Sequence, residues 1–217
     1  MPQRTLAILF LLFSFLASAL AADKVDPAPA FNDPAASAGV KQALEDKGYS
    51  ITVGDKVLVQ MWLRKAVPVA DKPAADGLFY PQLTPGELIG VATFPEATRD
   101  FRNQLVKPGT YTMRYELIPA DGDHLGVSPN RDFVLLSPIA DDTDANAVYK
   151  FEDMVALSRK STGTKHPQPF CLIDPKSGGP KVTRDEDNDY TIFSTSLSLA
   201  GGKTIPISFI VKGQAQQ

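Results

Sequence analysis

The sequence predicts a mainly β protein, an antiparallel β-sandwich of the immunoglobulin-like or Greek-key kind with one or two short helices. Three observations lead to this prediction. Apolar and polar side chains alternate along several short stretches, and turn-forming residues separate these stretches at short intervals. The chain also contains 15 glycines and 18 prolines among its 217 residues. This composition favours many short elements joined by turns over long helices.

The alternation is clearest in residues 56–64, which follow a Gly54-Asp55 turn and a shorter stretch at 50–53. We expect a hairpin here. Its longer strand would place Val57, Val59, Met61 and Leu63 on one face, and would leave the face of Trp62 and Arg64 at least partly wet. Further strands are predicted at 87–94, 109–118, 132–136, 169–174, 190–199 and 204–212. Pro206 lacks an N–H, so the last strand should lie at a sheet edge or contain a bulge.

Two helices interrupt the strands. A short helix is plausible at 39–47, with Gly48 at its end. A second begins at Phe151, with acidic residues in its first turn, basic residues in its last turn, and Gly163 placed to stop it. The acidic run at 141–144 is a candidate source of its N-terminal cap.

Residues 1–21 have the three parts of a secretory signal. Arg4 supplies the positive start, residues 6–16 are mostly apolar, and Ala19 and Ala21 are the small residues that a signal peptidase recognises. The apolar stretch is shorter than the roughly 20 residues that span a bilayer. We therefore expect cleavage after Ala21, export to a periplasm or the medium, and no membrane span in the mature chain.

The remaining chain divides into three predicted parts. Residues 22–38 are rich in Ala, Pro and Asp and are expected to form a flexible or loosely docked leader. Residues 39–213 would form a single β-sandwich domain, and residues 214–217 a disordered tail.

Composition excludes several classes of function. The formal net charge of −3 makes nucleic acid a poor candidate partner, and a single cysteine excludes an internal disulfide framework or a thiolate metal cluster. That cysteine, Cys171, lies in an apolar stretch where a thiol packs as a small hydrophobic group. No catalytic residues and no cofactor are predicted, because no nucleophile elbow or phosphate-binding glycine loop is present.

A divalent metal is the one cofactor for which candidate ligands exist. Asp121, Asp123 and His124 share a loop softened by Gly122, and His166 lies in a second loop. If the fold joined these loops, two imidazoles and a carboxylate would suit zinc or copper. The alternative is a tight Asp-Gly-Asp turn capped by His124. The acidic run at 185–189 resembles the opening of a calcium loop but lacks its glycine and final glutamate, so a solvated turn explains it better.

Aromatic side chains form a second candidate site. Trp62, Phe79 and Tyr80 could stack on sugar rings or anchor a partner protein if they are exposed. The alternative is that the single tryptophan of a β domain belongs to its core or to a second layer beneath it.

Residues 107–113 contain a Pro-Gly turn that leads into a strand beginning Tyr-x-Met, and the Asp121–His124 and Arg131–Phe133 segments follow. In this stretch the chain resembles uncharacterised exported bacterial β-sandwich proteins. The resemblance covers about half of the mature chain; it implies export and the sandwich fold, and carries over no catalytic residue.

Two functional hypotheses follow. The favoured one is a non-catalytic exported binding module that takes an unknown protein, glycan or small molecule through loops at one end of the sheets. The other is a metal-binding, and by extension metal-dependent enzymatic, protein that uses the Asp121–His124 loop.

Overall fold

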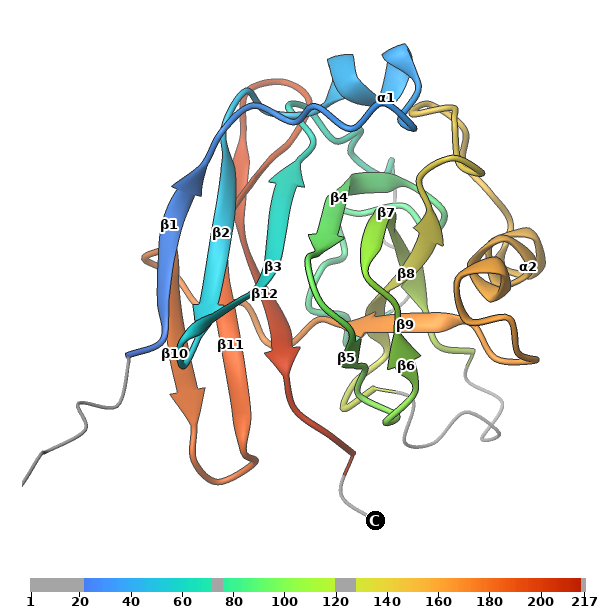
Figure 1. Ribbon diagram of the computed structural model, residues 1–217. Coiled ribbons are helices and arrows are strands. Elements are labelled where there is room, and N and C mark those ends of the chain that lie inside the picture. The colour runs from blue at the N-terminus through green and yellow to red at the C-terminus, as the bar shows by residue number, and fades with distance from the viewer. Residues whose placement is uncertain (1–21, 72–75, 120–127, 216–217) are drawn as a thin grey trace, which may run out of the picture.

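The protein consists of two antiparallel β-sheets packed face to face, with two short helices outside them (Figure 1). The computed structural model describes residues 22–71, 76–119 and 128–215. The larger sheet has the strand order β1-β2-β3-β4-β7-β8-β9 and the smaller one β10-β11-β12, while β5 and β6 pair as a separate hairpin. This architecture confirms the predicted mainly β, sandwich-like fold.

Most of the predicted strands are present. The helix predicted at 39–47 ends at Ala43 instead, Gly48 begins a strand, and the strand at 181–185 was not predicted. The larger sheet contains β1 (Lys24–Ala28), β2 (Gly48–Val53), β3 (Lys56–Leu63), β4 (Leu88–Phe94), β7 (Gly109–Leu117), β8 (Asp132–Pro138) and β9 (Gln168–Cys171). The smaller sheet contains β10 (Lys181–Asp185), β11 (Tyr190–Ser198) and β12 (Thr204–Lys212). The hairpin is β5 (Thr98–Arg99) with β6 (Leu105–Val106), and the helices are α1 (Ala38–Ala43) and α2 (Phe151–Thr162).

Strands within each sheet follow one another in chain order, as a meander. They do not alternate between the two sheets as the strands of an immunoglobulin domain do. A bridge between Leu172 and Phe209 brings the end of β9 against β12, so β9 to β12 lie in the order β9-β12-β11-β10, the spatial order of a Greek key. Pro206 lies on β12, an edge strand of the smaller sheet, as its missing N–H predicts.

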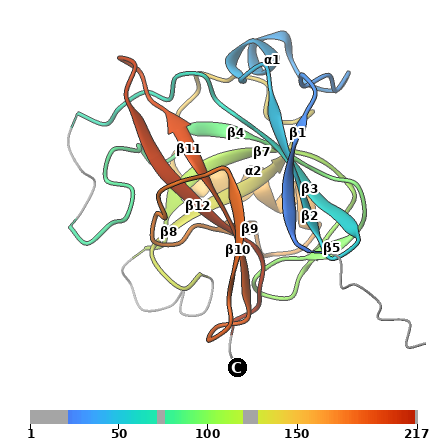
Figure 2. The same ribbon diagram turned by 90° about the vertical axis from the view of Figure 1, so that its left-hand side faces the viewer.

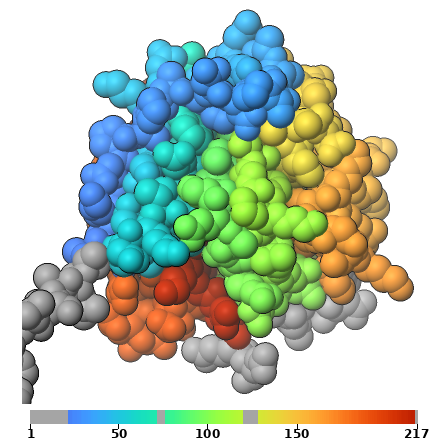
Figure 3. Space-filling view, in the orientation of Figure 1, coloured from blue at the N-terminus to red at the C-terminus, as the bar shows by residue number. Residues whose placement is uncertain are grey.

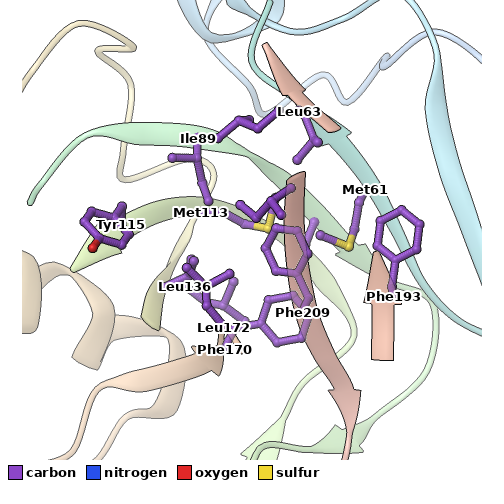
Figure 4. Close-up of a cluster of buried hydrophobic side chains, with 14 of the residues drawn as sticks. Met61, Leu63, Ile89, Met113, Tyr115, Leu136, Phe170, Leu172, Phe193 and Phe209 are labelled. Carbon is purple, nitrogen blue, oxygen red and sulfur yellow. The ribbon is translucent and has the colours of Figure 1, made fainter. Parts of the chain in front are cut away.

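The main core lies between the sheets, where their apolar faces meet (Figure 4). Phe209 of β12 is the aromatic centre of this core: its ring stacks on Phe170 at 5.6 Å and on Phe193 at 6.4 Å between centroids. Met61, Leu63, Ile89 and Met113 pack from the larger sheet. Cys171 is buried beside this core, in keeping with the prediction that its thiol packs as a hydrophobic group.

The face of β3 that was expected to be wet is buried instead. Trp62 is only 5% exposed and belongs to a second apolar cluster beneath α1. Its indole N–H donates to the carbonyl oxygen of Pro29 at 2.8 Å, and Phe31 packs on its ring at 5.1 Å between centroids. The larger sheet is therefore covered on both faces, by the smaller sheet on one side and by α1, α2 and the loop at 139–150 on the other.

The structure corrects the prediction that the leader at 22–38 is flexible. The ordered leader contributes to this cover of the sheet. Residues 24–28 form β1, which pairs with β2 from Lys24–Thr52 to Ala28–Gly48. The Asp23 carboxylate accepts hydrogen bonds from Gly54 N and Arg184 Nε, so the leader contacts both sheets. The low hydrophobicity of the leader did not indicate this role, because the leader is stabilised by backbone pairing and by packing against Trp62.

A β-bulge corrects the predicted face of Val57. Ile51 pairs with Val59 but Thr52 pairs with Val57, which leaves Leu58 as an extra residue on β3. The alternation shifts by one position at the bulge. Leu58 therefore packs against the core, whereas Val57 is 37% exposed.

A buried ion pair fastens the loop at 139–150 to the outer face of the larger sheet. Arg114 of β7 and Asp142 are both fully buried, and the guanidinium binds the carboxylate through Nε at 2.6 Å and Nη2 at 2.8 Å. The other N–H groups of Arg114 donate to the carbonyl oxygens of Gly86, Asp144 and Ala147. Thr112 also donates to Asp142. Every donor of this arginine thus has an acceptor, as a buried charge requires.

A second buried pair, formed where β3 ends and β4 begins, supports the same loop. Arg64 binds Glu87 and donates to the Ala145 carbonyl oxygen at 3.0 Å and to Asn146 Oδ1 at 2.9 Å. Because Asp142 binds Arg114, it is not available to cap α2. The cap predicted from the 141–144 run does not form: Lys150 is the N-cap residue and makes no side-chain cap bond. The C-terminal prediction is confirmed, since Gly163 ends α2 at φ 67°.

The sequence also predicted features of the two chain ends and the lack of a membrane span after signal cleavage. The predicted signal at 1–21 lies outside the described residues. Residues 214 and 215 were predicted to belong to a disordered tail but lie against the fold, because Ala215 N donates to Phe101 O at 2.9 Å; residues 216–217 lie outside the described part. Among the described residues, neither helix has the length and apolar character needed to cross a membrane.

Replacing Asp142 by Asn should lower the free energy of unfolding by about 3 to 5 kcal/mol, because it leaves the Arg114 charge buried without a counter-ion. Asp141→Asn is a matched control next to it: this residue pairs with Lys160 at the surface, and its loss should cost less than about 1 kcal/mol. Urea denaturation measures both. Equal midpoints for the two variants would contradict the role given to Asp142.

Replacing Gly48 by Ala should destabilise the fold by about 1 to 3 kcal/mol through overpacking. A Cβ atom at Gly48 would lie 2.5 Å from Trp62 Nε1 and 2.7 Å from the Met61 carbonyl oxygen. Gly39→Ala in α1 is the control, since its Cβ would meet no atom nearer than 3.9 Å and alanine favours helix. Thermal unfolding followed by the fluorescence of Trp62, the single tryptophan, reports both changes. An unchanged melting temperature and emission in Gly48→Ala would contradict the close packing.

Candidate functional site

A cleft of about 800 Å³ opens at one end of the sandwich. Four segments line it: the β2–β3 hairpin at 53–58, the 96–99 segment after β4, the β10–β11 turn at 186–189, and residues 212–215 after β12. Figure 3 shows the red end of β12 in the hollow between the cyan β2–β3 hairpin and the green β5–β6 segment. This volume is within the range of small-molecule and peptide sites in proteins.

The cleft exists because β3 and β4 separate. Their pairing runs only from Leu63–Gly90 to Gln60–Thr93. Phe94 instead pairs with Gly109 of β7 and packs against Tyr111 and Phe170 in the core. Pro95 follows, and the chain turns away into the β5–β6 hairpin. Residues 56–58 of β3 therefore line the opening.

The cleft has an apolar floor and a charged rim. Val53, Val57 and Leu58 supply apolar surface from the β2–β3 hairpin. At the mouth, the Lys56 ammonium lies 2.9 Å from the Glu96 carboxylate, which raises the pKa of Lys56. Both side chains are largely exposed, so this ion pair is a weak surface contact.

The acidic run at 185–189 forms the opposite side of the rim. Asp185 accepts hydrogen bonds from the backbone and side chain of Asn188 and thereby shapes the turn. Glu186, Asp187 and Asp189 are exposed and make no salt bridge among the residues that the structure describes. In the same described residues, no group of three or more His, Cys, Asp and Glu side chains is arranged to hold a metal ion. The run is thus an exposed turn that gives one wall of the cleft a negative charge.

Of the four candidate metal ligands, His166 is the one within the described residues. His166 is exposed in the loop between α2 and β9, and its carbonyl oxygen accepts a hydrogen bond from Thr162. Asp121, Asp123 and His124 lie outside the described residues. Their proximity to His166 stays a prediction.

The three candidate aromatic residues do not form an exposed platform. Trp62 lies in the cluster beneath α1, as described above. Tyr80 is 1% exposed; its hydroxyl donates to the Ile173 carbonyl oxygen and accepts from Ser208 N, and burial raises its pKa. Only Phe79 is exposed, at 38%. The stacking role is therefore wrong for Trp62 and Tyr80, whose polar groups already have partners inside the fold.

A smaller groove of about 390 Å³ lies along the seam between the two sheets, lined by β1, β2 and β11 residues and by Pro180. Figure 2 shows β1 and β10 at the neighbouring open edges of the sandwich. The Asp23–Arg184 ion pair ties these edges together at one end of the seam. This groove is half the size of the cleft and lies where the leader docks.

Among the buried carboxyl groups outside both grooves, Glu116 is poorly satisfied by hydrogen bonds. Glu116 of β7 is 2% exposed; its Oε2 accepts only a 3.3 Å bond from Leu117 N, and its Oε1 has no hydrogen-bond partner among the described residues. Burial, with a smaller contribution from the negative charge of Glu152, raises its pKa to about 7. Glu116 lies beneath the layer that covers the outer face of the larger sheet. Burial there disfavours the charged carboxylate, so the neutral acid is the more stable form.

Sequence reasoning placed the ligand site at one end of the sheets but named none of the residues of the cleft as its binding residues. The one local signal was the acidic run at 185–189, which was interpreted as a solvated turn in preference to a calcium loop. No family model, no curated protein and no solved structure matches the chain. The cleft is therefore the feature on which a functional proposal rests.

Replacing Glu116 by Gln should make the stability less dependent on pH. The folded state holds the proton more tightly than the unfolded chain, so the parent loses stability as the pH rises from about 4.5 to about 7, whereas the amide does not titrate. At about pH 8 the variant should be more stable than the parent by about 3 kcal/mol, and near pH 4 the two should agree closely. Urea denaturation across this range measures the difference. Glu186→Gln, an exposed change, should show no such divergence; the same curve for both variants would overturn the assignment.

Proposed function

We propose that this protein is an exported, non-catalytic binding module and that the cleft between 53–58, 96–99, 186–189 and 212–215 is its ligand site. The observation that carries this proposal is the cleft itself, a volume of about 800 Å³ with an apolar floor and a charged rim. Apolar surface supplies affinity in such sites, and a few polar groups orient the ligand.

The position of the cleft supports a binding role. It lies at the end of the sandwich, where connections between strands meet, and sandwich domains place their binding loops at such ends. Behind it, the main core holds the two sheets together. A rigid scaffold with a preformed cleft loses little conformational entropy when a ligand binds.

The side chains that line the cleft favour binding over catalysis. Its carboxylates are exposed, and its cations are Lys56, Arg99 and Lys212, with no histidine or cysteine among the lining residues. A general acid–base pair requires a group whose pKa is tuned near the working pH. Glu116, the described carboxyl closest to that condition, does not line the cleft.

The test is a thermal-shift panel of short peptides, oligosaccharides and small organic acids and amines, read on the parent and on Val57→Trp. The new ring should fill the cleft without disturbing the core, because Val57 is already exposed. At least one class should raise the melting temperature of the parent, since a ligand at about 100 times its Kd stabilises by about 2.7 kcal/mol. Val57→Trp should abolish this shift.

Val148→Trp provides the matched control. Val148 is also exposed but lies in the loop at 139–150, outside the cleft, so its variant should keep the ligand-induced shift. A panel in which no class shifts the parent, or in which both variants respond like the parent, would refute the cleft as a ligand site.

A further inference from the structure

The edge of β3 that faces the cleft pairs on one side only. Residues 56–59 pair with β2, while β4 pairs only with residues 60–63. About half of the backbone N–H and C=O groups of such a strand segment point away from its partner. The cleft therefore offers hydrogen-bonding backbone along one wall as well as apolar surface.

Proline marks the other sheet edges, whereas the β3 segment contains a bulge at Leu58 and no proline. The outer strands of the two sheets are β1, β9, β10 and β12. Pro27, Pro169 and Pro206 lie within β1, β9 and β12, and Pro180 directly precedes β10. Proline removes a backbone donor and blocks pairing with a further strand. Residues 56–59, Lys-Val-Leu-Val, contain no proline.

The entrance to this edge is closed only by a surface contact. The Lys56–Glu96 ion pair bridges the gap where β3 and β4 separate, and both side chains are about two-thirds exposed. A pair of this kind contributes at most about 1 kcal/mol, so a strand that enters the gap loses little by displacing it.

Charge and apolar surface define the side chains that would accompany such a backbone. Leu58 and Val53 are half-buried on the floor, and Val57 is exposed beside them, so apolar side chains of the ligand have a place to pack. Across the cleft, the carboxylates of Glu186, Asp187 and Asp189 make no salt bridge in the described structure. They complement a basic side chain.

We propose that the ligand is an extended peptide segment, apolar with at least one Lys or Arg, which adds as a strand to residues 56–59 of β3. This inference rests on the proposed function of the cleft and goes further by naming the ligand class. Recognition by added strands draws affinity from the main chain and specificity from side-chain pockets.

Short random peptides displayed on phage are selected for binding to the protein without its predicted signal. The selected peptides are then synthesised individually. Selected peptides should combine β-branched or aromatic residues with Lys or Arg. N-methylation of a selected peptide should weaken binding by about tenfold or more at alternate positions and have little effect at the positions between, because a paired strand uses every second N–H. Isothermal titration measures each Kd.

Variants of the protein locate the site. Val57→Trp, and separately Glu186→Lys combined with Asp187→Lys, should each weaken binding by about tenfold or more. Asp46→Lys is the matched charge control, because Asp46 is exposed and does not line the cleft. It should leave the Kd unchanged. Circular dichroism and melting temperature establish that each variant is folded.

The outcomes separate the two proposals. Peptides that bind without an alternating N-methyl pattern, or without dependence on Val57, overturn the added strand. Oligosaccharides or small molecules that bind at the cleft while no peptide does so overturn the ligand class but leave the proposed function standing. If no class binds, both proposals fail.

Discussion

The buried pairing of Arg114 with Asp142 is the constraint on which the outer half of the structure depends. Both charges are fully buried, and every guanidinium N–H has an acceptor. Four of these acceptors belong to Asp142 and to the loop that follows it. Arg114 therefore neutralises the Asp142 carboxylate and also holds this loop against the sheet. Arg64, directly after β3, repeats the arrangement. With the loop held, α1, the leader and α2 complete a layer over a sheet face that would otherwise face water.

At the end of the sandwich, β3 and β4 of this sheet separate, while side chains of both strands still reach the core. Phe94 does so by pairing with β7 and packing among aromatic rings, and Leu58 does so through the bulge. The cleft is the space left between the separated strands, and its chemistry combines exposed backbone, a few apolar side chains and charges from the opposite sheet.

The sequence predicted the individual strands and helices better than it predicted which of them contact one another. Most strands, the span and C-terminal stop of α2, the packed thiol of Cys171 and the edge position of Pro206 follow from local patterns. Trp62 was ambiguous because its decisive partner, the Pro29 carbonyl oxygen, lies in a segment whose composition resembles a linker. Val57 was assigned to the core because strict alternation has no signal for the extra residue at Leu58. The cleft was missed because its four walls come from segments that are far apart in the chain.

The sequence by itself determined the period of each strand, the turn positions and the proline-marked edges, since these depend on steric and hydrogen-bonding preferences within a few residues. Tertiary structure decided which charges are buried together, which face of the large sheet is covered and where β3 lacks a neighbour. Each of these depends on contacts between residues tens of positions apart, such as Arg114 with Asp142 or Asp23 with Arg184. A buried charge is stable only beside a partner that the fold supplies, and no local pattern identifies that partner.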